Sequence, residues 1–223
     1  MTSLTAEEAL EKYQRRHRRN MRASHAQGFL LGVASMLQKG DLVIDCGANI
    51  GEVTQPLAET GASIHCFEPD PYAFEQLSSR VMKLDNVILH NAAVGTESGT
   101  VQLMRAVNFG ENPKGGSVKS TVLKGGRSID ESNPIDVELI DLIAFIKHAI
   151  ECSGEIAFLK MDIEGAELDI LERMEAENLF DSIRCTVVET HERKFKALRP
   201  RFKALKERVG NAYPVSKVNL DWI

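Results

Sequence analysis

A glycine-rich segment that follows a short apolar run carries the most informative chemistry in this chain. It has the pattern Asp45-x-Gly47-x-Asn49-x-Gly51, and a second apolar run ends at Glu68. Glycines at these positions allow a tight turn and a close approach of the backbone to a ligand, because they have no Cβ. The carboxylate of Glu68 can accept hydrogen bonds from a pair of ribose hydroxyls. Together these residues predict a site for a cofactor that contains a nucleoside.

The acidic Asp45 indicates which cofactor this is. Dinucleotide sites place a pyrophosphate at a helix N-terminus, where a carboxylate at the end of the strand would repel it. A carboxylate suits a cationic ligand instead, such as the amino group and sulfonium of S-adenosylmethionine. Asp45 therefore favours S-adenosylmethionine over a nicotinamide dinucleotide. Asn91, after a third apolar run, can contact the adenine edge or simply form a turn.

A second set of ionisable residues ends two later apolar runs. It consists of Lys160, Asp162 and Glu164 in one segment and Glu189 and His191 in the next. Strand alternation places Lys160 and Asp162 on one face. The imidazole of His191 can act as a general base, because a histidine ordinarily titrates near neutral pH. We expect these five residues to orient or deprotonate an acceptor hydroxyl, and the identity of the base stays open.

We predict no metal site from the sequence. The four cysteines have no C-x-x-C spacing, and three of them fall in predicted buried strands. As an alternative, Asp162, Glu164 and Glu189 can converge on Mg²⁺, because hard cations take carboxylate oxygens as ligands. Reduced, buried cysteines fit a cytoplasmic protein.

Length and composition favour one globular domain. The chain has 223 residues, 43% of them hydrophobic, and a formal net charge of −5, which argues against a nucleic-acid surface. There is no run of about 18 apolar residues, so we expect no membrane span. The first residues lack the apolar core of a signal peptide. The expected partner is a small-molecule hydroxyl acceptor, and homo-oligomer formation stays open.

Helices and strands alternate from residue 41 onward. Predicted strands cover 41–46, 63–68, 87–91, 100–104, 156–162, 185–190 and 214–220. Predicted helices end at Gly61 or cover 71–84, 138–149, 164–176 and 192–209, with Pro200 interrupting the last. Strands separated by helices pair in parallel through right-handed crossovers. The sequence therefore predicts an α/β fold with a mostly parallel, doubly wound sheet, whose ligands bind beyond the carboxyl ends of the strands.

Residues 1–40 form a predicted N-terminal helical extension ahead of the domain at 41–223. One helix begins with a capping box at Thr5 and Glu8, and a second is expected to begin at Ser24. The first helix contains five basic or histidine residues at 15–19. Glutamates about one or two turns earlier favour a solvated helix with charge pairs over a nucleic-acid contact.

The segment 108–133 is rich in Gly, Ser, Lys and Asn. A connection of this length inside a compact domain usually has a function. We expect it to be an irregular substrate loop.

Two blocks of the sequence resemble the FkbM family of S-adenosylmethionine-dependent methyltransferases. The first is V-I-D-C-G-A-N-I-G-E-V-T with H-C-F-E-P-D-P, and the second is F-L-K-M-D-I-E-G-A-E-L-D-I-L with V-V-E-T-H. The resemblance covers roughly 41–191. It implies a Rossmann-like class I methyltransferase fold and usually O-methylation of a small molecule, such as a sugar or polyketide hydroxyl.

The chain departs from this family in two places. The family usually has an Asp pair before the helix expected to begin near Glu138, where this chain reads Leu139-Ile140-Asp141. The C-terminus also looks short for the usual final pair of antiparallel strands.

Two alternatives use the same cofactor pocket. An RNA or protein methyltransferase is favoured by the basic residues at 15–19 and the lysines of 114–124, but the chain lacks an Asn-Pro-Pro-aromatic motif. A non-catalytic cofactor-binding module would bind the cofactor without turnover.

Overall fold

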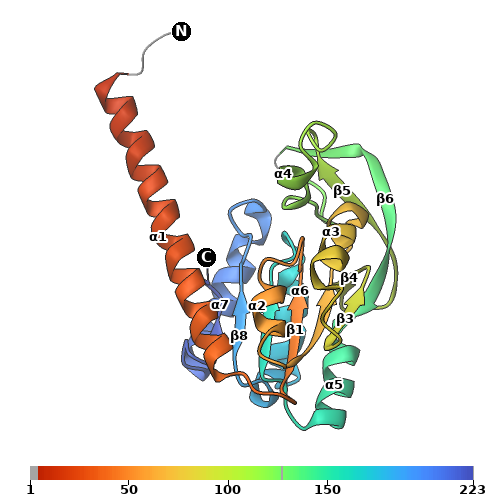
Figure 1. Ribbon diagram of the computed structural model, residues 1–223. Helices are drawn as coiled ribbons and strands as arrows, with labels where there is room; N and C mark the ends of the chain where they lie inside the picture. Colours follow the sequence, from red (N-terminus) through yellow and green to blue (C-terminus); the bar gives the residue numbers. More distant parts are fainter. Residues whose placement is uncertain (1–4, 127, 223) are drawn as a thin grey trace.

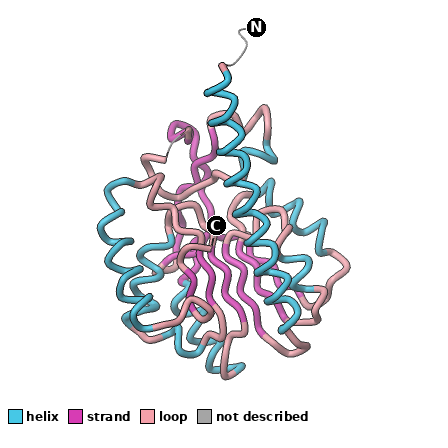
Figure 2. The backbone as a smooth tube through the Cα atoms, turned by 90° about the vertical axis from the view of Figure 1, so that its left-hand side faces the viewer, coloured by secondary structure: helices cyan, strands magenta, loops and turns pink. Residues whose placement is uncertain are grey.

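The computed structural model describes residues 5–126 and 128–222 of the protein. A six-stranded parallel sheet forms its centre, with helices on both faces (Figures 1 and 2). The strand order is β3-β2-β1-β7-β8-β9. These strands are β1 (Leu42–Cys46), β2 (Ser63–Phe67), β3 (Val87–His90), β7 (Phe158–Met161), β8 (Thr186–Val188) and β9 (Val218–Asn219). The predicted doubly wound parallel sheet is confirmed.

Five helices of the described chain cover this sheet, and two of them begin at a side-chain cap. The five are α2 (Thr54–Ala58), α3 (Pro71–Val81), α5 (Leu142–Ser153), α6 (Glu167–Ala176) and α7 (Arg199–Ala212), with 3₁₀ turns η1 (Leu179–Ser182) and η2 (Lys196–Leu198). Asp70 caps α3 by accepting from the backbone N–H of Tyr72 at 2.9 Å. Asp141 caps α5 in the same way, at 2.9 Å from the N–H of Ile143. An acceptor at the N-cap satisfies an amide that has no partner within the helix.

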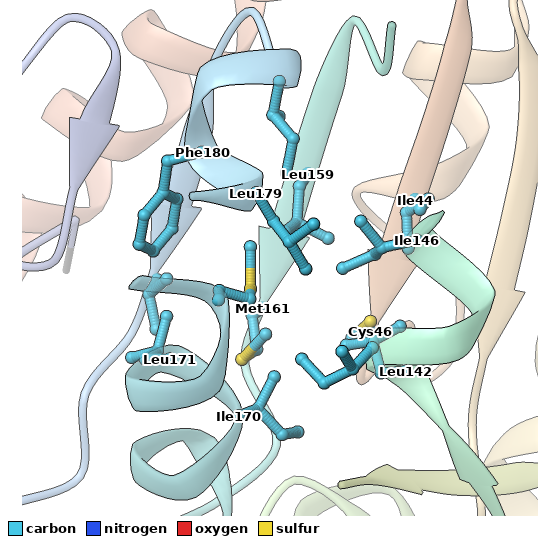
Figure 3. Packing of buried hydrophobic residues seen from close by; sticks show 14 of the residues in the cluster. Ile44, Cys46, Leu142, Ile146, Leu159, Met161, Ile170, Leu171, Leu179 and Phe180 are labelled. Carbon is cyan, nitrogen blue, oxygen red and sulfur yellow. The ribbon is translucent and has the colours of Figure 1, made fainter. Parts of the chain in front are cut away.

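Alternate residues of the strands pack into two cores, one on each face of the sheet. Ile44 and Cys46 point toward α5 and α6, where they meet Leu142 and Ile170 (Figure 3). Val43, which directly precedes Ile44 in the sequence, belongs to the opposite core. Both cores are built this way because successive strand side chains point to opposite faces.

The N-terminal extension is one helix instead of the two expected. Helix α1 (Ala6–Met36) runs through Ser24 without a break, because no glycine or proline stands between the two predicted segments. The predicted capping box at Thr5 and Glu8 is confirmed. Only Ala26 and Val33 of this helix are buried. Its N-terminal part projects from the domain (Figure 1).

A second sheet lies where an irregular loop and a helix start were expected. Its strands are β4 (Ala92–Gly95), β6 (Ile129–Asp141) and β5 (Gly99–Ala106), in the order β4-β6-β5, and a short helix α4 (Pro113–Ser117) precedes β6. Ile135, Val137 and Leu139 pack in one small core of this sheet. Their spacing of two is a strand pattern, so the residues around Glu138 belong to β6, and α5 begins four residues after that glutamate.

The C-terminal elements also differ from the sequence prediction. Helix α7 begins at Arg199, so Pro200 occupies the first turn, where a missing N–H costs nothing. The last strand, β9, has two residues and pairs in parallel with β8. Among the described residues no antiparallel pair closes the large sheet. No helix in the described ranges combines the length and apolar character that a membrane span requires.

Candidate functional site

The glycine-rich turn lies at the carboxyl end of β1. The chain continues from β1 to β2 and β3 on one side of this strand, and β7 lies on its other side, so the strand order changes direction at β1. Gly47 has a φ of +76°, and a Cβ there would lie 1.8 Å from the carbonyl oxygen of Asp162. Gly51 has a φ of +81°, and its Cβ would lie 2.7 Å from Leu77. Both glycines are therefore required by conformation and by space. The predicted tight turn is present at the switch point where such folds bind ligands.

Asp45 lies beneath this turn and is fully buried. Thr54 donates a hydrogen bond to Asp45 Oδ2 at 2.7 Å, and Lys160 Nζ lies 3.2 Å from Oδ1. Lys160 also donates to the carbonyl oxygen of Gly47 at 2.7 Å. Burial lowers the pKa of Lys160, but the attraction of Asp45 and Asp162 outweighs it and the pKa is raised. The ammonium thus stays charged.

This pairing changes the interpretation of two predicted residues. The carboxylate of Asp45 is balanced by Lys160 and does not line the cavity described below, and its contact with a cationic ligand stays a prediction. Lys160 is held by Asp45 and by the turn, so it stabilises the turn's conformation, and a role toward an acceptor stays a prediction.

Glu68 stands at the end of β2 beside the turn. Its two oxygens accept hydrogen bonds from the backbone N–H groups of Asn49 and Asp70, each at 2.8 Å. Burial raises its pKa to about 7. A carboxylate offers about four acceptor positions, so each oxygen retains acceptor capacity for a ligand hydroxyl.

Asn91 follows β3 and supports the same strand end from behind. Its side-chain amide donates to the carbonyl oxygens of Glu68 at 2.8 Å and Pro69 at 3.3 Å. It does not line the cavity next to Glu68. These bonds join residues 22 and 23 positions apart and therefore do not form a local turn, and contact with the adenine edge stays a prediction.

A cavity of about 630 Å³, including space open to solvent, extends from Glu68 to the end of β7. The glycine-rich turn, β2, β4 and the residues after β7 form its walls. Its polar lining residues are Asn49, Glu68, Ser117, Ser120, Thr121, Asp162 and Glu164.

The segment 108–133 covers this cavity. Ser117 accepts a hydrogen bond from Asn49 Nδ2 at 3.3 Å, and the hydroxyl of Thr121 donates to the carbonyl oxygen of Glu164 at 2.8 Å. The predicted substrate loop therefore lies against the site, although it contains α4 and the start of β6 and is less irregular than expected.

The segment is also anchored by Asp70, the N-cap residue of α3. Arg105 makes two hydrogen bonds to the fully buried carboxylate of Asp70, at 2.8 and 3.0 Å. Ser120 donates a third at 3.0 Å. The arginine comes from β5 of the second sheet, a strand that carries no local sign of this partner.

At the other end of the cavity, four carboxylates surround His191. Its Nδ1 lies 2.8 Å from Glu167 Oε1. Its Nε2 lies 3.5 Å from Glu164, 3.8 Å from Asp162 and 3.9 Å from Glu189. The structure thus brings together four of the five residues predicted to act on the acceptor, and Lys160 lies 4.0 Å from Asp162.

The charges in this cluster determine which groups can act as bases. Burial lowers the pKa of His191, but the carboxylates of Glu164 and Glu167 outweigh it and raise the pKa to about 10. In the absence of a bound cation this raised pKa disfavours a general-base role for His191 near neutral pH, and that role stays a prediction. Burial raises the pKa of Asp162 and of Glu189, and each side chain is 29% exposed.

The turn between β7 and α6 shapes the cluster. Glu164 was expected in the first helical turn, but α6 begins only at Glu167, and Glu164 has a left-handed φ of +58°. Glu167 Oε1 accepts from the N–H groups of Ile163 and Gly165, at 3.2 and 3.0 Å. Glu167 was missed as a site residue. Its signal was the K-x-D-x-E-G-x-E spacing, which does not reveal that the side chain folds back to His191.

The parallel sheet, the glycine-rich turn after β1 and the acid after β2 define a Rossmann-like fold of the class I methyltransferase type. Comparison with known proteins makes the assignment specific. The family described as the methyltransferase FkbM domain matches residues 45–209. The chain belongs to this methyltransferase family, as its resemblance predicted.

Two curated relatives are similar over most of the chain. Methyltransferase sdnD of Sordaria araneosa is 26% identical, and the alignment covers 83% of this chain and 78% of that protein. The 2-O-methyltransferase NoeI of Sinorhizobium fredii is 26% identical, with 62% of this chain and 60% of that protein covered. A solved structure, the methyltransferase FkbM from Methylobacillus flagellatus, is 20% identical with a TM-score of 0.35, covering 64% of this chain and 31% of that one.

Proposed function

We propose that this protein transfers the methyl group of S-adenosylmethionine to a hydroxyl of a small molecule, such as a sugar or a polyketide. The observation that carries the proposal is a single cavity with Glu68 at one end and the carboxylates of Asp162 and Glu164 at the other. One end suits ribose hydroxyls, and the other suits an acceptor that must lose a proton. The name of NoeI, a 2-O-methyltransferase, supports oxygen as the methylated atom.

The residues at the cofactor end fit S-adenosylmethionine. The buried carboxylate of Glu68 has acceptor capacity left for ribose hydroxyls, and Gly47 lets the backbone approach the ligand. The excess of carboxylates near His191 gives this part of the cavity a negative potential that favours a cationic sulfonium. The cofactor, when bound, supplies an electrophilic methyl group.

The chain's own residues orient the acceptor, take its proton and exclude water. Asp162 lines the cavity and is partly exposed, so its carboxylate can orient the acceptor hydroxyl and take its proton. Ser117, Ser120 and Thr121 line the cavity and help to exclude water from it. Holding the two reactants in line accounts for most of the expected rate enhancement.

The proposal is tested by incubating small-molecule extract with the protein and S-adenosylmethionine labelled in its methyl group. We expect mass spectrometry to find one class of hydroxylated metabolite that gains the label. The matched control is Asp162→Asn, which keeps the size of the side chain and removes its charge, and should transfer little label.

Two alternatives give different outcomes in this experiment. Label recovered in RNA or protein would indicate a macromolecular methyltransferase instead. Cofactor binding without label in any acceptor would indicate a non-catalytic binding module. Either result would contradict the proposed reaction.

A further inference from the structure

We propose that Asp162, Glu164 and His191 form a binding site for a divalent first-row transition-metal ion, with Mn²⁺ as the representative ion. The site lies in the wall of the cavity, since Asp162 and Glu164 line it. The role that we assign to the ion, which is to bind and acidify the acceptor hydroxyl, rests on the proposed function. Binding of the ion does not.

The spacing of the three side chains is the first argument. One ligand atom from each residue lies within 4.8 Å of the others. His191 Nε2 is 3.5 Å from Glu164 and 3.8 Å from Asp162, longer than the usual hydrogen bond of about 2.7–3.2 Å. Two ligands that share an ion at about 2.1 Å are separated by roughly 3.0–3.6 Å. The atoms therefore stand close to the spacing that a shared ion needs, but too far apart for good hydrogen bonds.

The orientation of the imidazole is the second argument. Nδ1 faces Glu167 Oε1 at 2.8 Å, and Glu167 is itself fully buried and held by backbone N–H groups. Metal-binding histidines usually donate their other ring N–H to such a carboxylate, which fixes the ring. Nε2 is thereby directed at Asp162 and Glu164. His191 is only 5% exposed, and its Nε2 lies 3.5 Å from Glu164 and 3.8 Å from Asp162, so among the described residues these carboxylates give it no close hydrogen bond.

The charge balance of the cluster is the third argument. Four carboxylates face one imidazole, those of Asp162, Glu164, Glu167 and Glu189. Of the neighbouring lysines, Lys160 is 3.2 Å from Asp45 and Lys194 contacts the second oxygen of Glu164. The half-buried cluster thus has more negative than positive charge, and a divalent cation would reduce the repulsion.

The ligand set indicates the kind of ion. One imidazole nitrogen with two carboxylate oxygens suits ions such as Mn²⁺ or Fe²⁺, whereas Mg²⁺ and Ca²⁺ prefer oxygen ligands alone. Three protein ligands leave coordination positions that face the cavity. An acceptor hydroxyl bound there would become more acidic, because the ion stabilises the oxyanion.

The test is a titration of the chelator-treated, full-length protein with Mn²⁺, in which electron paramagnetic resonance measures the free ion. We expect one Mn²⁺ per chain and an affinity at least about 10-fold higher than for Mg²⁺ in competition. Glu164→Gln and His191→Gln should each weaken Mn²⁺ binding at least about 10-fold. The matched control is Asp169→Asn on α6, because this side chain is 70% exposed and pairs with Arg201 away from the cluster.

Thermal unfolding of each variant separates loss of the site from loss of the fold. Asp162→Asn provides a second folded variant if His191→Gln does not fold. Absence of Mn²⁺ binding at millimolar concentration, or wild-type affinity in folded Glu164→Gln, would overturn the proposal. Full methyl transfer in the presence of chelator would overturn the catalytic role of the ion and leave the proposed function intact. If the protein binds Mn²⁺ but methylates no hydroxyl, the metal site stands and the proposed function is wrong.

Discussion

The two ends of the cavity hold their carboxylates in opposite ways. At the cofactor end, each oxygen of Glu68 accepts a backbone N–H at 2.8 Å, so the group is fixed before a ligand arrives. At the acceptor end, Asp162, Glu164 and Glu189 stand 3.5–3.9 Å from a single imidazole nitrogen. At the cofactor end both oxygens already have a hydrogen-bond donor. At the acceptor end the excess negative charge can still be neutralised by a cationic ligand or an ion.

This difference suits the cofactor end to binding and the acceptor end to the chemical step. A carboxylate held by two backbone N–H groups is a rigid acceptor for neutral hydroxyls, and its geometry is set by the local turn. A cluster with excess charge has perturbed pKa values, a common property of catalytic groups. Changes at the two ends should therefore alter different measurable quantities.

The largest effect is expected where the two ends meet, at Gly47. In Gly47→Ala the new Cβ would lie 1.8 Å from the carbonyl oxygen of Asp162, in a left-handed conformation. We expect a loss of about 3 kcal/mol or more in the free energy of unfolding, measured with urea. The control is Gly154→Ala, which has a φ of +83° but open space around the Cβ, and should lose only about 1–2 kcal/mol. Equal losses would show that the contact with Asp162 is unimportant.

Next in size is a separation of turnover from cofactor affinity. Asp162→Asn should lower turnover roughly 10²-fold or more and leave the affinity for S-adenosylmethionine near wild type. Glu68→Ala should do the opposite and weaken cofactor binding by about 1.5–3 kcal/mol in calorimetry. If Asp162→Asn mainly abolishes cofactor binding, the division between the two ends is wrong.

The buried Glu68 predicts a pH dependence of stability that is specific to the cofactor end. Its pKa of about 7 in the folded protein exceeds the ordinary value of 4.5, so the folded protein binds this proton more tightly than the unfolded chain. The resulting stabilisation is complete below pH 4.5 and is lost as the pH rises through about 7.

The measurement compares the wild type with Glu68→Gln, whose side chain cannot ionise. Between about pH 5 and 8, the free energy of unfolding of the wild type should fall relative to the variant by about 2–3 kcal/mol. Parallel pH curves for the two proteins would contradict the raised pKa.

Local patterns were sufficient to predict the large sheet and the turn. The apolar run before Asp45, the glycines at 47 and 51, and Glu68 after the next run each depend on residues close in sequence. The pairing of Asp45 with Lys160 could not be predicted in this way. It follows from the register of β1 against β7, which places the two residues side by side.

The second sheet was missed for the same physical reason. Strand β6 pairs with β5 across a long connection, and polar residues interrupt its apolar alternation until Ile135. The polar stretch resembles a loop and the apolar end resembles the start of a helix. Likewise, the contact of Glu167 with His191 joins residues 24 positions apart, so spacing alone did not assign it.

The left-handed backbone at Glu164 places stability and function in conflict. For a residue with a Cβ this conformation lowers the free energy of unfolding by about 1–2 kcal/mol, whereas glycine adopts it readily. Glu164→Gly should therefore raise the melting temperature modestly while lowering turnover, as thermal scans and methyl-transfer assays of one preparation would show. A laboratory selection for heat resistance alone would then favour glycine at this position and yield a more stable but less active enzyme. Unchanged turnover in a stabilised Glu164→Gly protein would mean that the strained glutamate has no catalytic value.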